Sequence, residues 1–341
     1  METKGIPGVG AGIVQAPMAG GAGTPELAAA VSEAGGLGFL AAGYKTAAQM
    51  RADIDRTRAL TGRPFGVNLF LPSTDVADQA AVAAYRERLL PEAARLGVEP
   101  GDAGDRTDDW DAKVADLLRD PPAVVSFTFG CPADEVLHGF RARGAVVVVT
   151  VTTPEEARLA AAADVLCVQG EEAGAHRGSF TNTDLPGVPI RELLPQVRAV
   201  TGLPLIAAGG LATAGHVAEV LALGAVAAQA GTAFLRTPES GASALHKRAL
   251  ADPRYTETAM TRAFSGRPAR GLVNRFLAEH SPHAPAVYPD VHYLTAPLRR
   301  AATAQGDPEG VNLWAGASWR LAAERPAAEI VAALSGAVGP A

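Results

Sequence analysis

The chain has 341 residues, of which 48% are hydrophobic and 19% charged, so it can bury a large core and is too apolar to be disordered. Its 30 Lys and Arg and 36 Asp and Glu give a formal net charge of -6 without a basic run, so we expect no nucleic-acid partner. The two cysteines, Cys131 and Cys167, exclude a disulfide scaffold and a cysteine-based zinc site and predict a cytoplasmic protein. Gly and Pro interrupt the longest uncharged stretches, so we expect no membrane span and no secretory signal.

Short apolar runs of strand length recur along the chain, and most are followed by an Ala-rich segment with helical periodicity. Continuous apolar runs that alternate with amphipathic helices are typical of parallel strands covered by helices. Eight such units predict an α/β fold of the (β/α)8 barrel type. The eight runs are residues 13–18, 38–43, 65–70, 123–130, 145–151, 165–170, 204–210 and 225–234.

Two regions do not fit a minimal barrel. Residues 1–236 are predicted to form the barrel, with an insertion at about 76–119 that contains a charged, Ala-rich helix and an acidic loop. Residues 237–341, rich in Arg, Pro and Ala, are predicted to form a helical subdomain on the substrate side, with a tail that closes back on the barrel. We therefore expect one large domain and one small one.

The chemistry of such a barrel lies at the carboxyl ends of its strands, and here these ends are rich in glycine and amides. Gly209-Gly210 and the turn from Gln229 to Thr232, which contains Gly231, follow the last two strands, where backbone N–H groups often bind phosphate. The alternative is that both are tight turns. Asn68 and Gln169 suit a planar heterocycle with donor and acceptor edges; alternatively, each ties a loop to the backbone.

Four segments at these strand ends resemble the signature motifs of the class I nitronate monooxygenases, once called 2-nitropropane dioxygenases. In chain order they read QAPMAGG from Gln15, GVNLF from Gly66, SFTFG from Ser126 and EEAGAHRG from Glu171. The resemblance continues through IAAGGLAT, QAGTAFLRTPES and TRAFSGRPARGLVNRF, so it covers nearly the whole chain.

The resemblance implies a barrel that binds FMN without covalent attachment. It also implies that the chain oxidises alkyl nitronates, such as propionate 3-nitronate, with dioxygen to a carbonyl compound and nitrite or nitrate. Neither a metal nor a macromolecular partner is implied. The positions carried over for cofactor binding are Ala16, Pro17, Met18, Asn68, Gln169, Gly174, Gly209, Gly210, Gln229, Gly231 and Thr232.

His176 is the catalytic candidate, because it belongs to the EEAGAHRG motif and also lies on the loop after the strand at 165–170. This loop can place an imidazole over a flavin. The family pattern has a second glycine before this histidine, whereas this chain has Ala175; if the position requires positive φ, alanine costs about 1 kcal/mol there. Phe70, Phe129 and the segment around Trp314 are candidates for an apolar wall. The other histidines are predicted to be structural or solvent-facing: His138, His216, His246, His280, His283 and His292.

Two other functions remain open. A flavin-dependent, NADH-using enoyl-acyl-carrier-protein reductase shares the APM start and the AAGG turn, although the HRG loop and the insertion weaken its case. The second open function is that of a barrel that binds flavin or a phosphorylated ligand without redox turnover. The strand ends carry no Lys for a Schiff base and no His/Asp/Glu cluster for a metal, which disfavours the common non-flavin chemistries.

Overall fold

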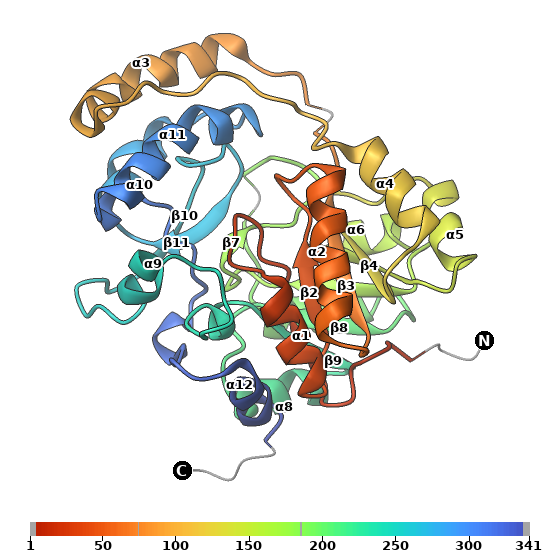
Figure 1. Cartoon of the computed structure of the whole chain (residues 1–341). Coiled ribbons are helices and arrows are strands. Elements are labelled where there is room, and N and C mark those ends of the chain that lie inside the picture. The colour runs from red at the N-terminus through yellow and green to blue at the C-terminus, as the bar shows by residue number, and fades with distance from the viewer. Residues whose placement is uncertain (1–4, 74, 185, 337–341) are drawn as a thin grey trace.

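In the computed structural model, which describes residues 5–73, 75–184 and 186–336, parallel strands form a nearly closed barrel (Figure 1). The strand order within the described residues is β1-β9-β8-β6-β5-β4-β3-β2. Leu37 closes the ring, because its N–H donates to Ile13 O and its O accepts from Gln15 N, both at 2.9 Å. All eight predicted runs contain one barrel strand. The strands are β1 Ile13–Gln15, β2 Gly38–Ala41, β3 Phe65–Phe70, β4 Val124–Thr128, β5 Val146–Val151, β6 Val165–Gln169, β8 Leu205–Ala208 and β9 Ala227–Ala230.

Both faces of the strands are buried, which explains why the runs are continuously apolar. Along β5, Val147 and Val149 pack toward the surrounding helices, while Val146 and Val148 fill the barrel interior. The first of these helices begins as its sequence predicts, since Thr24 Oγ1 accepts from Leu27 N at 3.0 Å. The helices around the barrel are α1 Pro25–Glu33, α2 Ala47–Leu60, α5 Asp134–Arg141, α6 Pro154–Leu159, α7 Ile190–Arg198 and α8 Ala214–Ala222.

The insertion contributes α3 Gln79–Leu96 and α4 Trp110–Arg119, which are joined by the acidic loop. The loop contacts two parts of the molecule that are far apart in sequence. On one side Arg106 Nη1 lies 2.6 Å from Asp290 Oδ2. On the other side Asp108 Oδ1 accepts from the backbone N–H of Tyr44 at 2.8 Å. The insertion therefore joins the tail to the barrel.

The sequence predicts a helical tail, but the structure also has two short strands there. The tail contains β10 Thr258–Thr261 and β11 Ala269–Leu272, and β11 also pairs with β7 Ala175–His176 from the barrel loop. These short strands escaped prediction because TAMT and ARGL show no apolar alternation and are held by backbone pairing. The helices of the tail are α9 Ala244–Ala249, α10 Arg275–His280, α11 Asp290–Ala304 and α12 Ala327–Leu334.

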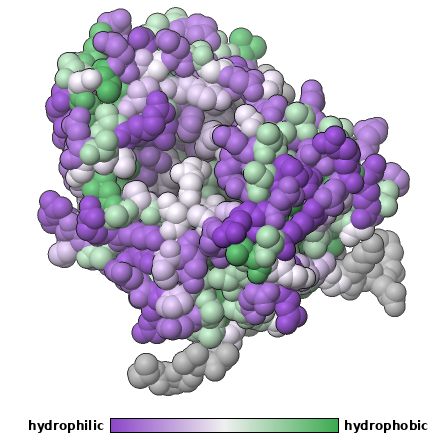
Figure 2. Space-filling view, in the orientation of Figure 1, coloured by the Kyte–Doolittle hydropathy of each residue, from purple (hydrophilic) through white to green (hydrophobic). Residues whose placement is uncertain are grey.

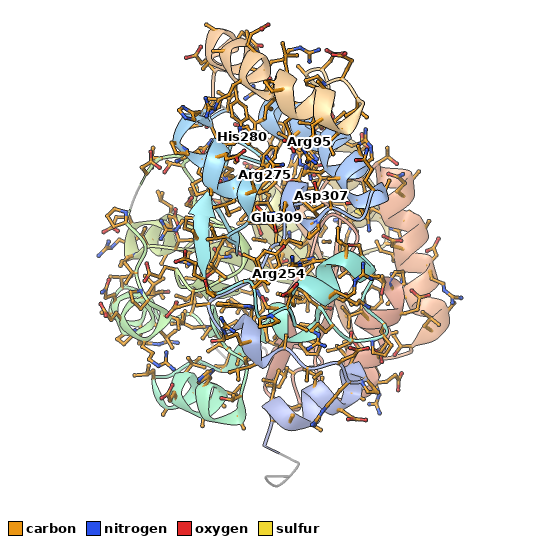
Figure 3. The ribbon with its side chains drawn as sticks, turned by 90° about the vertical axis from the view of Figure 1, so that its left-hand side faces the viewer. Arg95, Arg254, Arg275, His280, Asp307 and Glu309 are labelled. Atoms are coloured by element: carbon orange, nitrogen blue, oxygen red, sulfur yellow. The ribbon has the colours of Figure 1, made fainter. Side chains whose placement is uncertain are left out.

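Charged side chains fix α3 to the tail (Figure 3). Glu92 on α3 lies 2.7 Å from Arg275 and 2.8 Å from Arg95, and Arg95 also lies 2.8 Å from Asp307. The two arginines lower the pKa of Glu92 despite the opposing effect of its burial. Each cation in this cluster has a carboxylate partner.

Among the described helices, none has the length and apolar character needed to cross a bilayer.

Candidate active site

A cavity of about 420 Å³ lies at the carboxyl ends of the barrel strands, between the barrel loops and the tail. The space-filling view shows the surface hollowed where these two parts meet (Figure 2). Every predicted catalytic and cofactor-binding residue lines this cavity, as do Phe70 and Trp314, whereas Phe129, the other candidate for an apolar wall, does not. The predicted catalytic and cofactor-binding residues are Ala16, Pro17, Met18, Asn68, Gln169, Gly174, His176, Gly209, Gly210, Gln229, Gly231 and Thr232.

Backbone forms one part of the cavity wall. Gly209 and Gly210 have φ of +118° and +67°, conformations that glycine adopts without a steric cost. The tail returns to these turns, since Ser318 Oγ donates to Gly210 O at 2.8 Å and Gly316 N donates to Thr232 Oγ1 at 3.0 Å. The glycines of these turns carry no side chain, which lets a ligand approach their backbone.

The two strand-end amides have different environments. Asn68 Oδ1 accepts from Ser126 Oγ at 2.8 Å and from Thr128 Oγ1 at 3.0 Å, which leaves its Nδ2 as the donor for a ligand. In contrast, Gln169 donates to His176 O at 3.2 Å and accepts from Gly178 N at 2.7 Å. The side chain of Gln169 thus ties the loop to the strand, as the alternative interpretation expected, while it also lines the cavity.

His176 lies where the barrel loop meets the tail. Its Nε2 is 2.8 Å from Ser265 Oγ. Removal from water, together with the positive charges of Arg267 and Arg299, lowers the pKa of His176 to about 3, so the ring is neutral at physiological pH. Aromatic rings surround it, with centroids 5.8 to 6.5 Å from its own: Phe70, Phe129, Tyr288 and Trp314.

The residue before His176 adopts the conformation that a glycine would favour. Ala175 has a φ of +61° and pairs with Arg270 of β11. An L-residue with a side chain is strained in this region by about 1 kcal/mol relative to glycine. The loop nevertheless keeps its place, because β7 is paired with β11 on one side and Gln169 holds it on the other.

Comparison with known proteins identifies the family. The family model described as "Nitronate monooxygenase" matches residues 9–336. This chain belongs to the nitronate monooxygenase family. It is accordingly an oxidoreductase that acts on nitronates.

Relatives of this family cover nearly the whole chain. A nitronate monooxygenase of Pseudomonas aeruginosa is 42% identical over 337 residues, 94% of this chain and 94% of that protein. A solved structure of nitroalkane oxidase from Streptomyces ansochromogenes is 55% identical with a TM-score of 0.93, covering 95% of this chain and 94% of that one. FabK from Thermotoga maritima is more distant, with 28% identity and a TM-score of 0.72 over 94% of this chain and 90% of its own.

Two histidines that the sequence placed outside the site also line the cavity. His246 has its Nε2 3.0 Å from Trp314 O, and His292 stacks on Tyr44 with 3.9 Å between ring centroids. Both contacts are structural, so the predicted structural role of these two histidines stays a prediction, while their position at the cavity is new. Each is a lone histidine on a tail helix, and only the tertiary packing of that helix brings it to the cavity.

Arg299 on α11 also lines the cavity, and no sequence pattern pointed to it. Its position follows from how the insertion holds α11. Gly101 N donates to Leu294 O at 2.9 Å, and Tyr293 OH donates to Asp105 O at 2.6 Å. A motif-based search misses such a residue, because the contact depends on an inserted loop that the sequence predicts only in outline.

Proposed function

We propose that this chain binds FMN without covalent attachment and uses dioxygen to oxidise alkyl nitronates, such as propionate 3-nitronate, to a carbonyl compound and nitrite or nitrate. The observation that carries the proposal is the convergence of the predicted cofactor positions and His176 on one cavity. The family membership supports nitronates as the substrate class.

The residues present fit a flavin mononucleotide. The glycine turns after β8 and β9 offer backbone to a phosphate, and the free amide Nδ2 of Asn68 can donate to a heterocycle. The volume of about 420 Å³ lies in the range of small-molecule sites. When bound, FMN would supply the electron acceptor that passes electrons from the nitronate to dioxygen.

The side chains around His176 would bind and orient the substrate. A nitronate is already a carbanion equivalent, so the reaction needs no strong base. Ser265 Oγ can donate to His176 Nε2, and in that tautomer Nδ1 carries the proton and can donate to a nitronate oxygen. The neighbouring rings of Phe70 and Trp314 would exclude water from the reacting anion.

Neutral nitroalkanes form a second candidate substrate class, because the Streptomyces relative is named a nitroalkane oxidase. Such a substrate would have to lose a proton. In the alternative arrangement the single proton of Ser265 Oγ is donated to Arg267 O at 3.2 Å instead, so His176 Nε2 donates to Ser265 Oγ and Nδ1 is free to act as the base. The low pKa of His176 makes it a weak base, so we expect preformed nitronates to be the better substrates.

The deciding experiment compares electron donors under anaerobic conditions. Purified protein should carry flavin absorbance, and propionate 3-nitronate or a simple alkyl nitronate should bleach it, whereas NADH should act slowly or not at all. Saturable bleaching by NADH with no response to any nitronate would favour the reductase instead. A colourless protein that takes up no added FMN would contradict both flavin enzymes.

We also propose a cytoplasmic location. Cys131 and Cys167 are both free thiols, as expected in a reducing compartment. Fractionation of the source cells, with detection of the native protein, tests this directly.

A further inference from the structure

The cavity has an unusual charge distribution. Among the described residues that line it, Arg299 is the only Lys, Arg, Asp or Glu, and the other polar groups are amides, hydroxyls and the imidazoles of His176, His246 and His292. Removal from water lowers the pKa of all three imidazoles, so they are neutral at physiological pH. Arg299 therefore supplies the only full charge that a ligand in this cavity would meet.

The guanidinium of Arg299 is held by its own helix. Its Nε donates to Thr295 Oγ1 at 3.2 Å, and its Nη2 donates to His292 O at 2.9 Å. Thr295 is itself fixed, since it is fully buried and its hydroxyl donates to Phe264 O at 2.6 Å. These contacts occupy Nε and Nη2, and within the described chain Nη1 has no hydrogen-bond partner.

No carboxylate among the described residues pairs with this arginine, although the chain has many ion pairs. Arg275 and Arg106, for example, have Glu92 and Asp290 as partners. Removal from water lowers the pKa of Arg299 to about 10, so the side chain keeps its charge at neutral pH. An unpaired cation in a water-poor cavity is costly, and a bound anion relieves that cost.

A second arginine near His176 does not share this role. Arg267 also lacks a carboxylate partner among the described residues, but its guanidinium lies 3.9 Å from the ring centroid of Phe129 and donates to Ser179 O. It does not belong to the cavity lining. Protein groups thus surround the guanidinium of Arg267, although its Nε has no hydrogen-bond partner within the described chain, whereas Arg299 faces the ligand space.

We propose that Arg299 is the substrate-binding residue that recognises the negative charge of the nitronate, and that it determines the specificity of the site for anions. The inference deepens the proposed function and rests on it for the identity of the anion. Arg299 and His176 have separate tasks: the arginine supplies the countercharge, and the neutral imidazole supplies an oriented hydrogen bond. Arg299 Nη2 lies 3.3 Å from His292 Nδ1, and both residues line the same cavity as His176.

The test uses Arg299→Gln and Arg299→Lys in the FMN-loaded protein, with Arg300→Gln as the matched control. Arg300 is the next residue of α11, is exposed and does not line the cavity. Nitrate serves as the probe, because it is a planar oxyanion that cannot be oxidised. Its binding is measured by isothermal titration calorimetry, and KM and kcat are measured with an alkyl nitronate.

We expect Arg299→Gln to weaken nitrate binding and to raise KM by about 10- to 100-fold, the effect of one lost hydrogen bond to a charged group, with kcat changed less. Arg299→Lys should lose less nitrate affinity and raise KM less than Arg299→Gln, because lysine keeps the positive charge but lacks the planar donors of a guanidinium. Arg300→Gln should match the parent protein. FMN content and Tm are recorded for each variant.

Two results would overturn the inference. One is a folded Arg299→Gln protein with unchanged nitrate affinity and unchanged KM. The other is loss of FMN from that variant while KM at saturating FMN stays the same, which would assign Arg299 to the cofactor. Failure of the proposed function is distinct, because the parent protein would then oxidise no nitronate, while nitrate titration would still test the anion site.

Discussion

The two walls of the cavity are built from different chemistry. The barrel wall consists largely of glycine backbone and uncharged amides such as Asn68 and Gln169. The tail wall carries side chains with specific shape and charge, among them Trp314, His292 and Arg299. This difference fits our proposals that the barrel wall binds FMN and that the tail wall, through Arg299, selects the substrate.

The largest effect is expected at the junction of the two walls. His176→Ala should lower kcat with a nitronate by about 100-fold or more, the cost of one lost donor at the reacting oxygens. FMN should remain bound, because the glycine turns lie on other strands. Stopped-flow turnover at saturating nitronate measures the loss, and His138→Ala, an exposed histidine on α5, is the control. Unchanged turnover would return His176 to a structural role.

A change in the barrel wall should instead reduce the binding of FMN. A Cβ at Gly231 would lie 3.3 Å from Ala16 Cβ and 3.8 Å from Met18 Sδ, so the branched side chain in Gly231→Val fills space beside the turn. We expect FMN affinity to fall by about 10-fold or more, the equivalent of 1.4 kcal/mol. Flavin absorbance after dialysis measures retention. Gly62→Val, where a Cβ would meet open space, is the control; full retention in both variants would contradict the phosphate assignment.

The three histidines of the cavity should make the protein less stable in acid. Removal from water lowers the pKa of His176, His246 and His292 to about 3, 4 and 2, below the ordinary value near 6.5. Below pH 6.5 the unfolded state therefore binds more protons than the folded state, and stability falls as the pH falls. Each histidine should cost about 2 kcal/mol between pH 7 and pH 5. Urea unfolding at these two pH values should show a smaller loss for His246→Gln than for the parent, and an equal loss would refute this prediction.

The smallest effect concerns the loop between the walls. Ala175→Gly should raise the free energy of unfolding by about 0.5 to 1 kcal/mol, since glycine accepts the φ of +61° without strain. Ala30→Gly, inside α1, should do the reverse, because glycine is unfavourable in a helix. Urea denaturation measures both. Destabilisation by Ala175→Gly would show that the alanine methyl makes contacts worth more than the strain.

The barrel could be predicted from sequence because its strands are buried on both faces. A run such as Val146–Val151 is then apolar throughout, and its length and repetition indicate the fold. The glycine turns that line the cavity could be located for a related reason, because glycines at strand ends leave a visible pattern, while their role in binding a cofactor stays a prediction. Both signals are local, so one sequence is enough to find them.

The sequence indicated one part of the tail wall, the segment around Trp314, but not the positions of His292 and Arg299, because these depend on distant contacts. His292 and Arg299 reach the cavity only when α11 is fixed by the insertion, through Tyr293 and Asp290. The sheet formed by β7, β10 and β11 rests on backbone pairing between short, partly polar segments that resemble loops in the sequence. Tertiary packing overrides local propensity in both cases.

The return of the tail to the glycine turns has a consequence for biosynthesis. Gly316 and Ser318 complete the wall beside Thr232 and Gly210, yet they leave the ribosome about one hundred residues after the barrel strands that they contact. Synthesis proceeds at roughly 5 to 20 residues per second, so a barrel that has already folded waits several seconds with this wall open. The glycine turns therefore receive this part of their wall only after nearly the whole chain has been made.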